Sequence, residues 1–298
     1  MTSEATLRVA VPSEDALGES VFWYASEQAL YWIDFFGPTL HRWDPASRAR
    51  HEWAIPGSKQ VGSAVPLTEG RLLLALDDGL HIFDPARTRV AFFADPNGGR
   101  PGIGYNDSKI DRAGRYWVGT YDEAEREPRG ILYRVDPDGS AHVGDSGYIV
   151  CNGPAFSPDG RILYFSDTAG RRLLAYDLDP ATGALGTARL FAAVGEDAGL
   201  PDGLTVDAEG FVWCAHYGGG RVTRFAPDGR VDRTIALPVP FVTSCCFGGP
   251  ALETLYITTA RSGMGEAALA AAPSSGALFA VEPGMRGIAD RPFVLGVG

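Results

Sequence analysis

Short apolar runs, rich in β-branched and aromatic residues, recur along the chain, and a turn precedes each of them. The runs are ALYWID, GRLLLAL, GRYWVGT, GRILYFSDT, GFVWCAHY and TLYITTA. Equivalent marker positions, aligned on the leucine of RILYF, are Leu30, Leu73, Trp117, Leu163, Trp213 and Leu255. The steps between them are 43, 44, 46, 50 and 42 residues. After most runs comes a second strand-like stretch that ends in a turn, such as LHIFDPART.

A period in the mid-forties with about four short strands per copy is typical of propeller blades. No helical stripe of useful length competes with this pattern, and only GEAALAAA could form a helical turn. The six copies therefore predict an all-β fold, a single six-bladed β-propeller domain over residues 1–298. We expect TLRVAV (6–11) and RPFVLGVG (291–298) to be strands of one shared blade that closes the ring and removes exposed edges.

One position in each copy carries the candidate chemistry. Eight residues before the turn residue that precedes each marker strand stand Glu19, Gly62, Asn106, Asn152, Asp202 and Ser244. If this position starts the innermost strand, rotation about the propeller axis brings all six to one mouth of the channel. Two carboxylates and two amides would then form an axial metal site for Ca²⁺, Mg²⁺, Mn²⁺ or, less typically, Zn²⁺. Without a cation, two carboxylates at such a short distance would repel each other, and one of them would tend to take up a proton.

The alternative is that these residues are ordinary turn formers, because Asp and Asn are common in turns. The PDG at 201–203 supports that alternative at first sight, since the same letters form hairpin turns at 137–139, 158–160 and 227–229. However, the copy at 201–203 stands at a different point of the repeat from the other three. Its Asp202 is one of the six equivalent positions listed above, from Glu19 to Ser244, which we call the column. Glu is a poor turn residue, so the shared offset favours a site.

Composition excludes several classes of partner. The formal charge of -11 argues against nucleic acid or an anionic membrane, which require a basic face. No stretch of eighteen apolar residues and no apolar signal-peptide core are present, so neither a membrane span nor a signal peptide is predicted. The four cysteines form no C-x-x-C pair. They fit small buried hydrophobes in a reducing, cytoplasmic compartment.

The stretches around these residues resemble the SMP-30/gluconolactonase (regucalcin-like) family over nearly the whole chain. The resemblance is carried by LGESVFW, YNDSKIDRAGRYWVGT, CNGPAFSPDGRILYFSDT and PDGLTVDAEGFVWCAHYGGGRVTRFAPDG. It implies a six-bladed propeller that holds one divalent cation and hydrolyses lactones of sugar acids. By position it implies that Glu19, Asn152 and Asp202 are metal ligands, that Asn106 contacts substrate, and that Asp202 is also the general base.

The resemblance also leaves points open. Either a free oxygen of Asp202 accepts the proton, or a hydroxide on the cation attacks while Asp202 orients it. Tyr105, Glu123 and His216 are further candidates for substrate binding, although a single histidine such as His216 is more often structural than catalytic. The charged loop at 121–130 is either a solvated loop or a lid over the mouth.

Two departures from the family pattern bear on the substrate. Gly104 stands where the family commonly has an Arg, and Ala124 stands where some members have an acid. Loss of an Arg removes a partner for an anion, so we expect neutral aldonolactones, such as gluconolactone, xylonolactone or arabinonolactone, to be preferred. The alternatives are a phosphotriesterase-type hydrolase and a non-catalytic calcium-binding propeller. We expect the protein to be a monomer.

Overall fold

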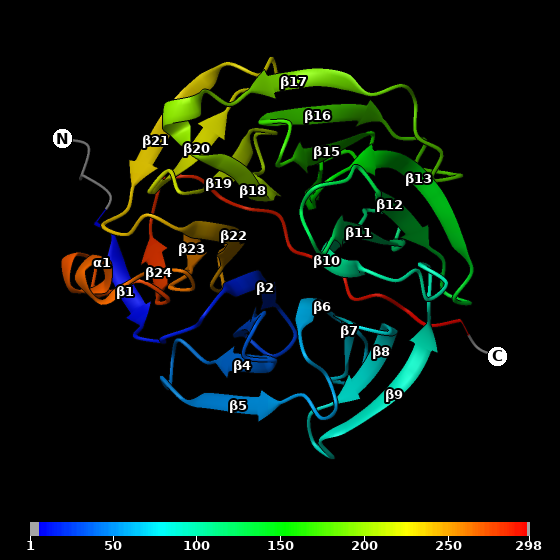
Figure 1. The fold of residues 1–298 in the computed structure, drawn as a ribbon, viewed down its shortest axis with the longest axis horizontal. Helices are drawn as coiled ribbons and strands as arrows, with labels where there is room; N and C mark the ends of the chain where they lie inside the picture. Colours follow the sequence, from blue (N-terminus) through cyan, green and yellow to red (C-terminus); the bar gives the residue numbers. More distant parts are fainter. Residues whose placement is uncertain (1–5, 297–298) are drawn as a thin grey trace.

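The computed structural model describes residues 6–296, and it is a six-bladed β-propeller of six four-stranded antiparallel sheets (Figure 1). The innermost strands of the six blades are β2 (Gly18–Tyr24), β6 (Val61–Pro66), β10 (Ile103–Ile110), β14 (Cys151–Phe156), β18 (Leu200–Val206) and β22 (Val242–Gly248). The second strands are β3 (Ala29–Asp34), β7 (Leu72–Leu76), β11 (Tyr116–Asp122), β15 (Ile162–Asp167), β19 (Val212–Tyr217) and β23 (Thr254–Thr259).

The third strands are β4 (Thr39–Trp43), β8 (Gly79–Asp84), β12 (Gly130–Val135), β16 (Arg172–Asp177), β20 (Arg221–Phe225) and β24 (Leu278–Val281). The outermost strands are β5 (Arg50–Ala54), β9 (Arg89–Ala94), β13 (Ala141–Tyr148), β17 (Arg189–Ala193), β21 (Val231–Ala236) and β1 (Arg8–Val11). Two short helical segments, η1 (Glu196–Ala198) and α1 (Glu266–Ala271), lie in connections. The predicted helical turn at GEAALAAA corresponds to α1.

The predicted repeat is confirmed strand by strand. Every marker residue lies in the second strand of its blade and is fully buried, which places the marker in the middle of the blade where apolar surface is covered on both faces. The apolar clusters run between neighbouring blades: one joins Tyr31 on β3 to Leu74 on β7, and another joins Ala155 on β14 to Cys214 on β19. All four cysteines are buried and free, as expected of small core residues.

The ring closes through its N-terminal strand. β1 pairs antiparallel with β24 as the outer strand of the last blade, next to strands from the other end of the chain (Figure 1). The prediction that residues 291–298 add a strand to the same blade is wrong for the described part, and residues 297 and 298 lie outside the described residues. Phe293 instead forms a β-bridge with Leu67, next to another blade, and is fully buried. The C-terminal segment, red in Figure 1, crosses the central part of the ring.

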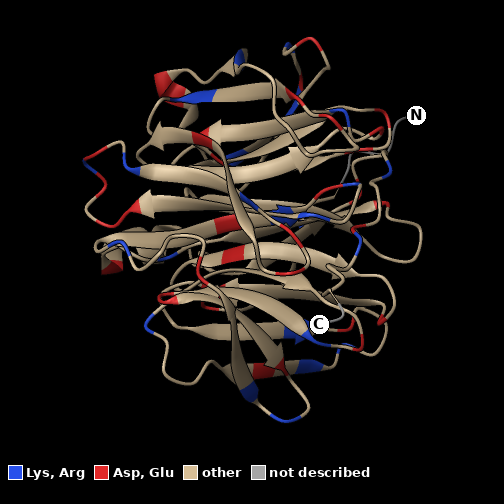
Figure 2. Cartoon of the chain, turned by 90° about the vertical axis from the view of Figure 1, so that its right-hand side faces the viewer, with Lys and Arg blue, Asp and Glu red and all other residues tan. Residues whose placement is uncertain are grey.

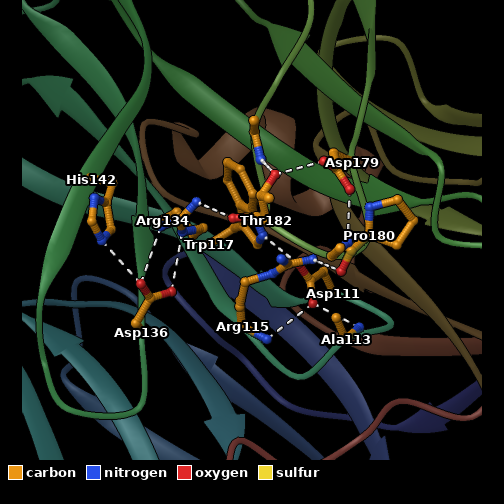
Figure 3. Close-up of polar contacts among 12 residues, drawn as sticks. Asp111, Ala113, Arg115, Trp117, Arg134, Asp136, His142, Asp179, Pro180 and Thr182 are labelled. Carbon is orange, nitrogen blue, oxygen red and sulfur yellow. Dashed lines mark hydrogen bonds and ion pairs between the residues drawn. The ribbon is translucent and has the colours of Figure 1, made fainter.

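A buried aspartate fixes the turn before two of the marker strands. Asp111 accepts hydrogen bonds from the backbone N–H groups of Ala113 and Arg115 and from Nε1 of Trp117, the marker itself (Figure 3). Its charge is paired with Arg115 at 2.7 Å. Asp207 makes the equivalent contact with Trp213. This repeated contact locks the turn onto the core of the blade, so the inner strand that precedes the turn is held in a defined position.

Charged side chains gather mainly in the turns at the ends of the strands and on outer strands (Figure 2). The interior strands carry few charges. Their buried acidic residues include Glu19 and Asp202. Within residues 6–296, no helix has the length and apolar character needed to cross a membrane.

Candidate active site

All six residues of the predicted column lie near the start of an innermost strand. At this level each innermost strand has an irregularity in its pairing with the second strand, for example between Glu19 and Phe22 in β2 and between Asn152 and Ala155 in β14. The irregularities of the other four innermost strands, β6, β10, β18 and β22, lie at equivalent positions. Bulges redirect side chains and are frequent beside active sites. Here they turn column side chains toward the propeller axis.

Four of the column residues line one pocket. Glu19, Asn106, Asn152 and Asp202 surround a cavity of about 210 Å³ at the mouth of the channel. The remaining walls are largely apolar and aromatic, with three hydroxyl groups and one further acid: Leu17, Phe35, Phe36, Tyr121, Glu125, Val150, Thr168, Leu200 and Tyr217. A polar floor with apolar walls is the usual construction of a small-molecule site. Gly62 and Ser244, the other two column residues, are not among the residues that line it.

The two amides are oriented by a hydrogen-bond chain. Nδ2 of Asn106 donates to the carbonyl oxygen of Cys151 at 2.9 Å and to Oδ1 of Asn152 at 2.8 Å. Nδ2 of Asn152 donates to Oγ1 of Thr168 at 3.1 Å, and Thr168 in turn donates to the carbonyl oxygen of Pro201. Both N–H groups of Asn106 are therefore used inside the protein, and its oxygen remains for a ligand in the pocket.

The two carboxylates are held by strained or closely packed backbone. Ser20 has φ = 51°, an unusual value for a residue other than glycine, and its N–H donates to Oε2 of Glu19 at 2.9 Å. Ser20 keeps that conformation because Oγ exchanges hydrogen bonds with the backbone of Ala64. The backbone oxygen of Asp202 accepts a hydrogen bond from Oγ of Ser166 at 2.7 Å.

Gly203 explains the PDG sequence at 201–203. A Cβ at Gly203 would lie 2.8 Å from Cα of Ser244 on β22, so only glycine allows the two inner strands to approach this closely. The stretch belongs to β18 and forms no hairpin turn. Asp202 thus stands on a strand at the pocket, and the glycine after it serves strand packing.

Burial dominates the electrostatics of the site. Glu19 and Asp202 are 7% and 6% exposed. Burial raises the pKa of Glu19 well above its ordinary value, and the negative charges of Asp202 and Asp107 raise it further. Burial and then the charge of Asp107 raise the pKa of Asp202 in the same way. Two carboxyls with raised pKa values at the floor of one pocket are strongly suggestive of a functional site.

The three additional substrate-binding candidates do not line the pocket. Tyr105 is buried in the core, where its hydroxyl donates to Asp95 at 2.7 Å, because its side chain precedes the bulge of β10 and points between blades. Glu123 is exposed in the loop at 121–130. Its place at the pocket is taken by Glu125, which has φ = 51°.

His216 is 2% exposed and pairs with Pro201, and neither of its ring nitrogens makes a hydrogen bond within the described residues. Burial, followed by the charge of Arg221, lowers the pKa of His216 to about 4. It is thus a neutral residue behind the wall of the pocket, and the wall itself is formed by its neighbour Tyr217, which stacks on Phe241 with ring centroids 4.5 Å apart.

The residues that sequence reasoning missed lie at the ends of the second strands. Tyr121 and Tyr217 are the last or penultimate residues of β11 and β19, and Thr168 directly follows β15. They occupy nearly the same place in their copies, four or five residues after the marker. Because the second strand runs antiparallel to the innermost one, its end returns to the mouth, so the repeat count that located the column could have located them too.

Several known proteins resemble this chain over nearly its whole length. The model of the SMP-30/gluconolactonase/LRE-like region matches residues 17–261. The chain belongs to this family. A 6-deoxy-6-sulfogluconolactonase of Pseudomonas putida is 36% identical over 289 residues, which cover 97% of this chain and 98% of the relative. The pentonolactonase XacC of Haloferax volcanii is 34% identical, with 93% of this chain and 94% of the relative covered.

Among solved structures, a calcium-binding protein described as a regucalcin from Agrobacterium tumefaciens superposes on this family member with a TM-score of 0.92. The two chains are 28% identical, and the match covers 97% of each. The described residues therefore have the fold of a regucalcin-like propeller.

Proposed function

We propose that this protein is a divalent-cation-dependent hydrolase that opens the lactone ring of a neutral aldonic acid. The general activity follows from the family: the protein is a sugar lactone hydrolase, like the two relatives named above as lactonases. The observation that supports the rest is the meeting of Glu19, Asn106, Asn152 and Asp202 in one pocket.

The donor set fits a hard divalent cation. Glu19, Oδ1 of Asn152 and Asp202 would hold it, since carboxylate and amide oxygens are the ligands that such cations prefer. The raised pKa values of Glu19 and Asp202 support this, because two buried carboxylates with like charge need a compensating positive charge to remain ionised together. Oδ1 of Asn152 accepts one hydrogen bond, from Asn106, within residues 6–296, which leaves a lone pair for a cation.

When bound, the cation would polarise the lactone carbonyl and stabilise the negative charge that develops on its oxygen. The side chains of the protein supply the remaining functions. Asp202 would accept the proton of the attacking water through the carboxylate oxygen that does not hold the cation. Asn106 positions the substrate through its side-chain oxygen, and the aromatic walls exclude bulk water from the reacting ester.

The preference for a neutral substrate rests on the charges of the pocket. Its described lining contains three acids, Glu19, Glu125 and Asp202, and neither a lysine nor an arginine. Three arginines near Gly104 do not line the pocket: Arg129 pairs with Asp122, Arg100 donates to the backbone of Arg129, and Arg126 is exposed in the loop. An anionic group on the lactone would therefore have no lysine or arginine partner among the lining residues.

Tyr121 and Gln60 fill the place of the missing side chain. A Cβ on Gly104 would overlap the ring of Tyr121 and lie 2.8 Å from Nε2 of Gln60. The hydroxyl of Tyr121 donates to Oε1 of Gln60 at 3.0 Å, and the backbone N–H of Gln60 is held by Asp77. The wall beside Gly104 is thus neutral and fixed, which suits the uncharged face of a sugar ring.

A lactone panel tests this proposal. The protein is supplied with Ca²⁺, Mn²⁺, Mg²⁺ or Zn²⁺, and acid release is followed with gluconolactone, xylonolactone, arabinonolactone, glucarolactone and 6-deoxy-6-sulfogluconolactone, with a phosphotriester as the competing substrate class. We expect the neutral lactones to be hydrolysed fastest. Faster hydrolysis of the two anionic lactones would overturn the substrate preference. Activity on the phosphotriester alone, or on no substrate at all, would overturn lactone hydrolysis itself.

A further inference from the structure

Asp107 is a buried carboxylate that the repeat count passes over. It follows Asn106 within the bulge of β10, where the pairing with β11 is interrupted between Tyr105 and Ser108. Its side chain does not line the pocket at the mouth. It lines a small cavity of about 20 Å³ deeper along the axis, whose other lining residues include Ser20, Lys109 and Asp290. A cavity of this size with polar groups in its lining has room for a water molecule.

Asp107 is tied to the backbone that carries two of the proposed ligands. One of its oxygens accepts the N–H of Ser108 at 2.9 Å, and the other accepts the N–H of Gly153 at 3.0 Å. Gly153 directly follows Asn152 in β14. It also approaches β18 so closely that a Cβ there would lie 2.9 Å from the backbone oxygen of Asp202. The carboxylate of Asp107 therefore sits beneath the junction of β10, β14 and β18.

The charge of Asp107 reaches the mouth. It contributes to the raised pKa values of both Glu19 and Asp202, after burial in each case and, for Glu19, after Asp202. Burial raises the pKa of Asp107 itself, while the charge of Lys109 opposes that rise. Lys109 compensates only in part, because its Nζ also lies 3.6 Å from a carboxylate oxygen of Asp290.

We propose that Asp107 supplies a third negative charge that strengthens cation binding by Glu19, Asn152 and Asp202 without being a ligand, and that this charge destabilises the cation-free protein. The proposal rests on the cation site of the proposed function. Asp107 acts as a supporting residue: it holds the bulge beside Asn152 through Gly153 and places its charge beneath the floor of the pocket. Lys109 weakens the same field, so the two residues should have opposite effects on cation affinity.

Titration calorimetry with Ca²⁺ and with Mn²⁺ tests the proposal on the full chain, alongside thermal unfolding in chelator. Asp107→Asn keeps the size of the side chain, removes the charge and leaves one acceptor oxygen for the N–H groups of Ser108 and Gly153. We expect the Kd to rise about 10- to 100-fold, the usual range for residues that support metal ligands. We expect its Tm in chelator to rise, because the relieved repulsion among the buried carboxylates outweighs the one hydrogen bond lost. Lys109→Met should lower the Kd severalfold. Asp111→Asn is the matched control: a buried aspartate of the same blade whose charge is paired, so its Tm should fall while its Kd stays unchanged.

The outcomes separate this proposal from the proposed function. If the wild-type protein binds neither cation, the cation site is wrong and the role of Asp107 falls with it. If the wild-type protein binds but Asp107→Asn binds equally tightly, the cation site stands and only the role of Asp107 is overturned. If Asp107→Asn does not fold, Lys109→Met decides, because a purely structural role of Asp107 predicts no gain in affinity for that variant.

Discussion

Nδ2 of Asn106 donates a hydrogen bond to Oδ1 of Asn152 at 2.8 Å and thereby joins the innermost strands of two neighbouring blades at the floor of the pocket. The bond fixes which atom of each amide faces the pocket. Asn152 must present its oxygen at this point, since its nitrogen is held by Thr168. The arrangement couples the residue proposed to touch substrate to a residue proposed to hold the cation.

Replacing Asn106 by Leu should disturb both functions. The variant keeps a side chain of similar size but has no N–H to donate, so Oδ1 of Asn152 would lose the hydrogen bond that orients it. We expect kcat/KM for gluconolactone to fall about 10- to 100-fold, with a rise in the Kd for the cation measured by calorimetry. An unchanged Kd together with a higher KM would mean that Asn106 contacts substrate only and does not orient Asn152.

Removing the charge of a proposed ligand should separate activity from stability. Glu19→Gln and Asp202→Asn each eliminate a buried carboxylate whose pKa is raised by burial and by its neighbours. We expect lactonase activity to fall at least about 100-fold. In chelator the free energy of unfolding, measured by urea denaturation, should rise or stay constant because repulsion is relieved. A large loss of stability with activity retained would contradict the assigned roles.

Gly104 should tolerate no side chain while Tyr121 is in place. A Cβ at position 104 overlaps the ring of Tyr121, so Gly104→Ala should lower the free energy of unfolding by about 1–3 kcal/mol through overpacking. The double variant Gly104→Arg, Tyr121→Ala makes room and adds a positive charge. Its ratio of kcat/KM for glucarolactone to that for gluconolactone should exceed the wild-type ratio. The single variant Tyr121→Ala is the control, and an equal shift in it would show that the charge is irrelevant.

His216 should make stability depend on pH in the acid range. Burial lowers its pKa from 6.5 to about 4, so the unfolded chain takes up a proton at this residue before the folded protein does. The contribution of neutral His216 to the free energy of unfolding is complete above pH 6.5. It is lost as the pH falls toward 4, which lowers the free energy of unfolding by about 3 kcal/mol in total. The free energy of unfolding, measured by urea denaturation between pH 6.5 and 4.5, should fall less steeply with decreasing pH in His216→Leu than in the wild-type protein. An identical slope would assign the dependence to other groups.

Much of this architecture was predictable because it repeats. The marker strands and the column were found by counting alone, since rotation about one axis converts a fixed offset into a common position in space. Glu19, Asn152 and Asp202 meet in the pocket for that reason. Tyr105 was predicted to bind substrate but lies in the core. The extra residue of the bulge lies between Tyr105 and Ser108, and such an insertion changes which face of the sheet the side chains on either side of it occupy.

Features outside the repeat were not predictable in this way. The C-terminal stretch has strand-like letters, yet Phe293 packs beside Leu67 in a different blade, a contact that no local pattern encodes. The role of Gly104 likewise depends on Tyr121 and Gln60, which are 17 and 44 residues away in the sequence. Asp107 was overlooked because its neighbour Asn106 occupied the counted position.

Hydrolysis of gluconolactone before and after removal of divalent cations is the measurement that tests the central claim most directly. The protein is stripped with a chelator, dialysed, and assayed by pH-stat with Ca²⁺, Mn²⁺, Mg²⁺ and Zn²⁺ added back singly, beside Asp202→Asn treated identically. We predict that the stripped protein is inactive, that at least one cation restores activity, and that none restores it in Asp202→Asn. Full activity of the stripped wild-type protein, or equal restoration in Asp202→Asn, would contradict the account.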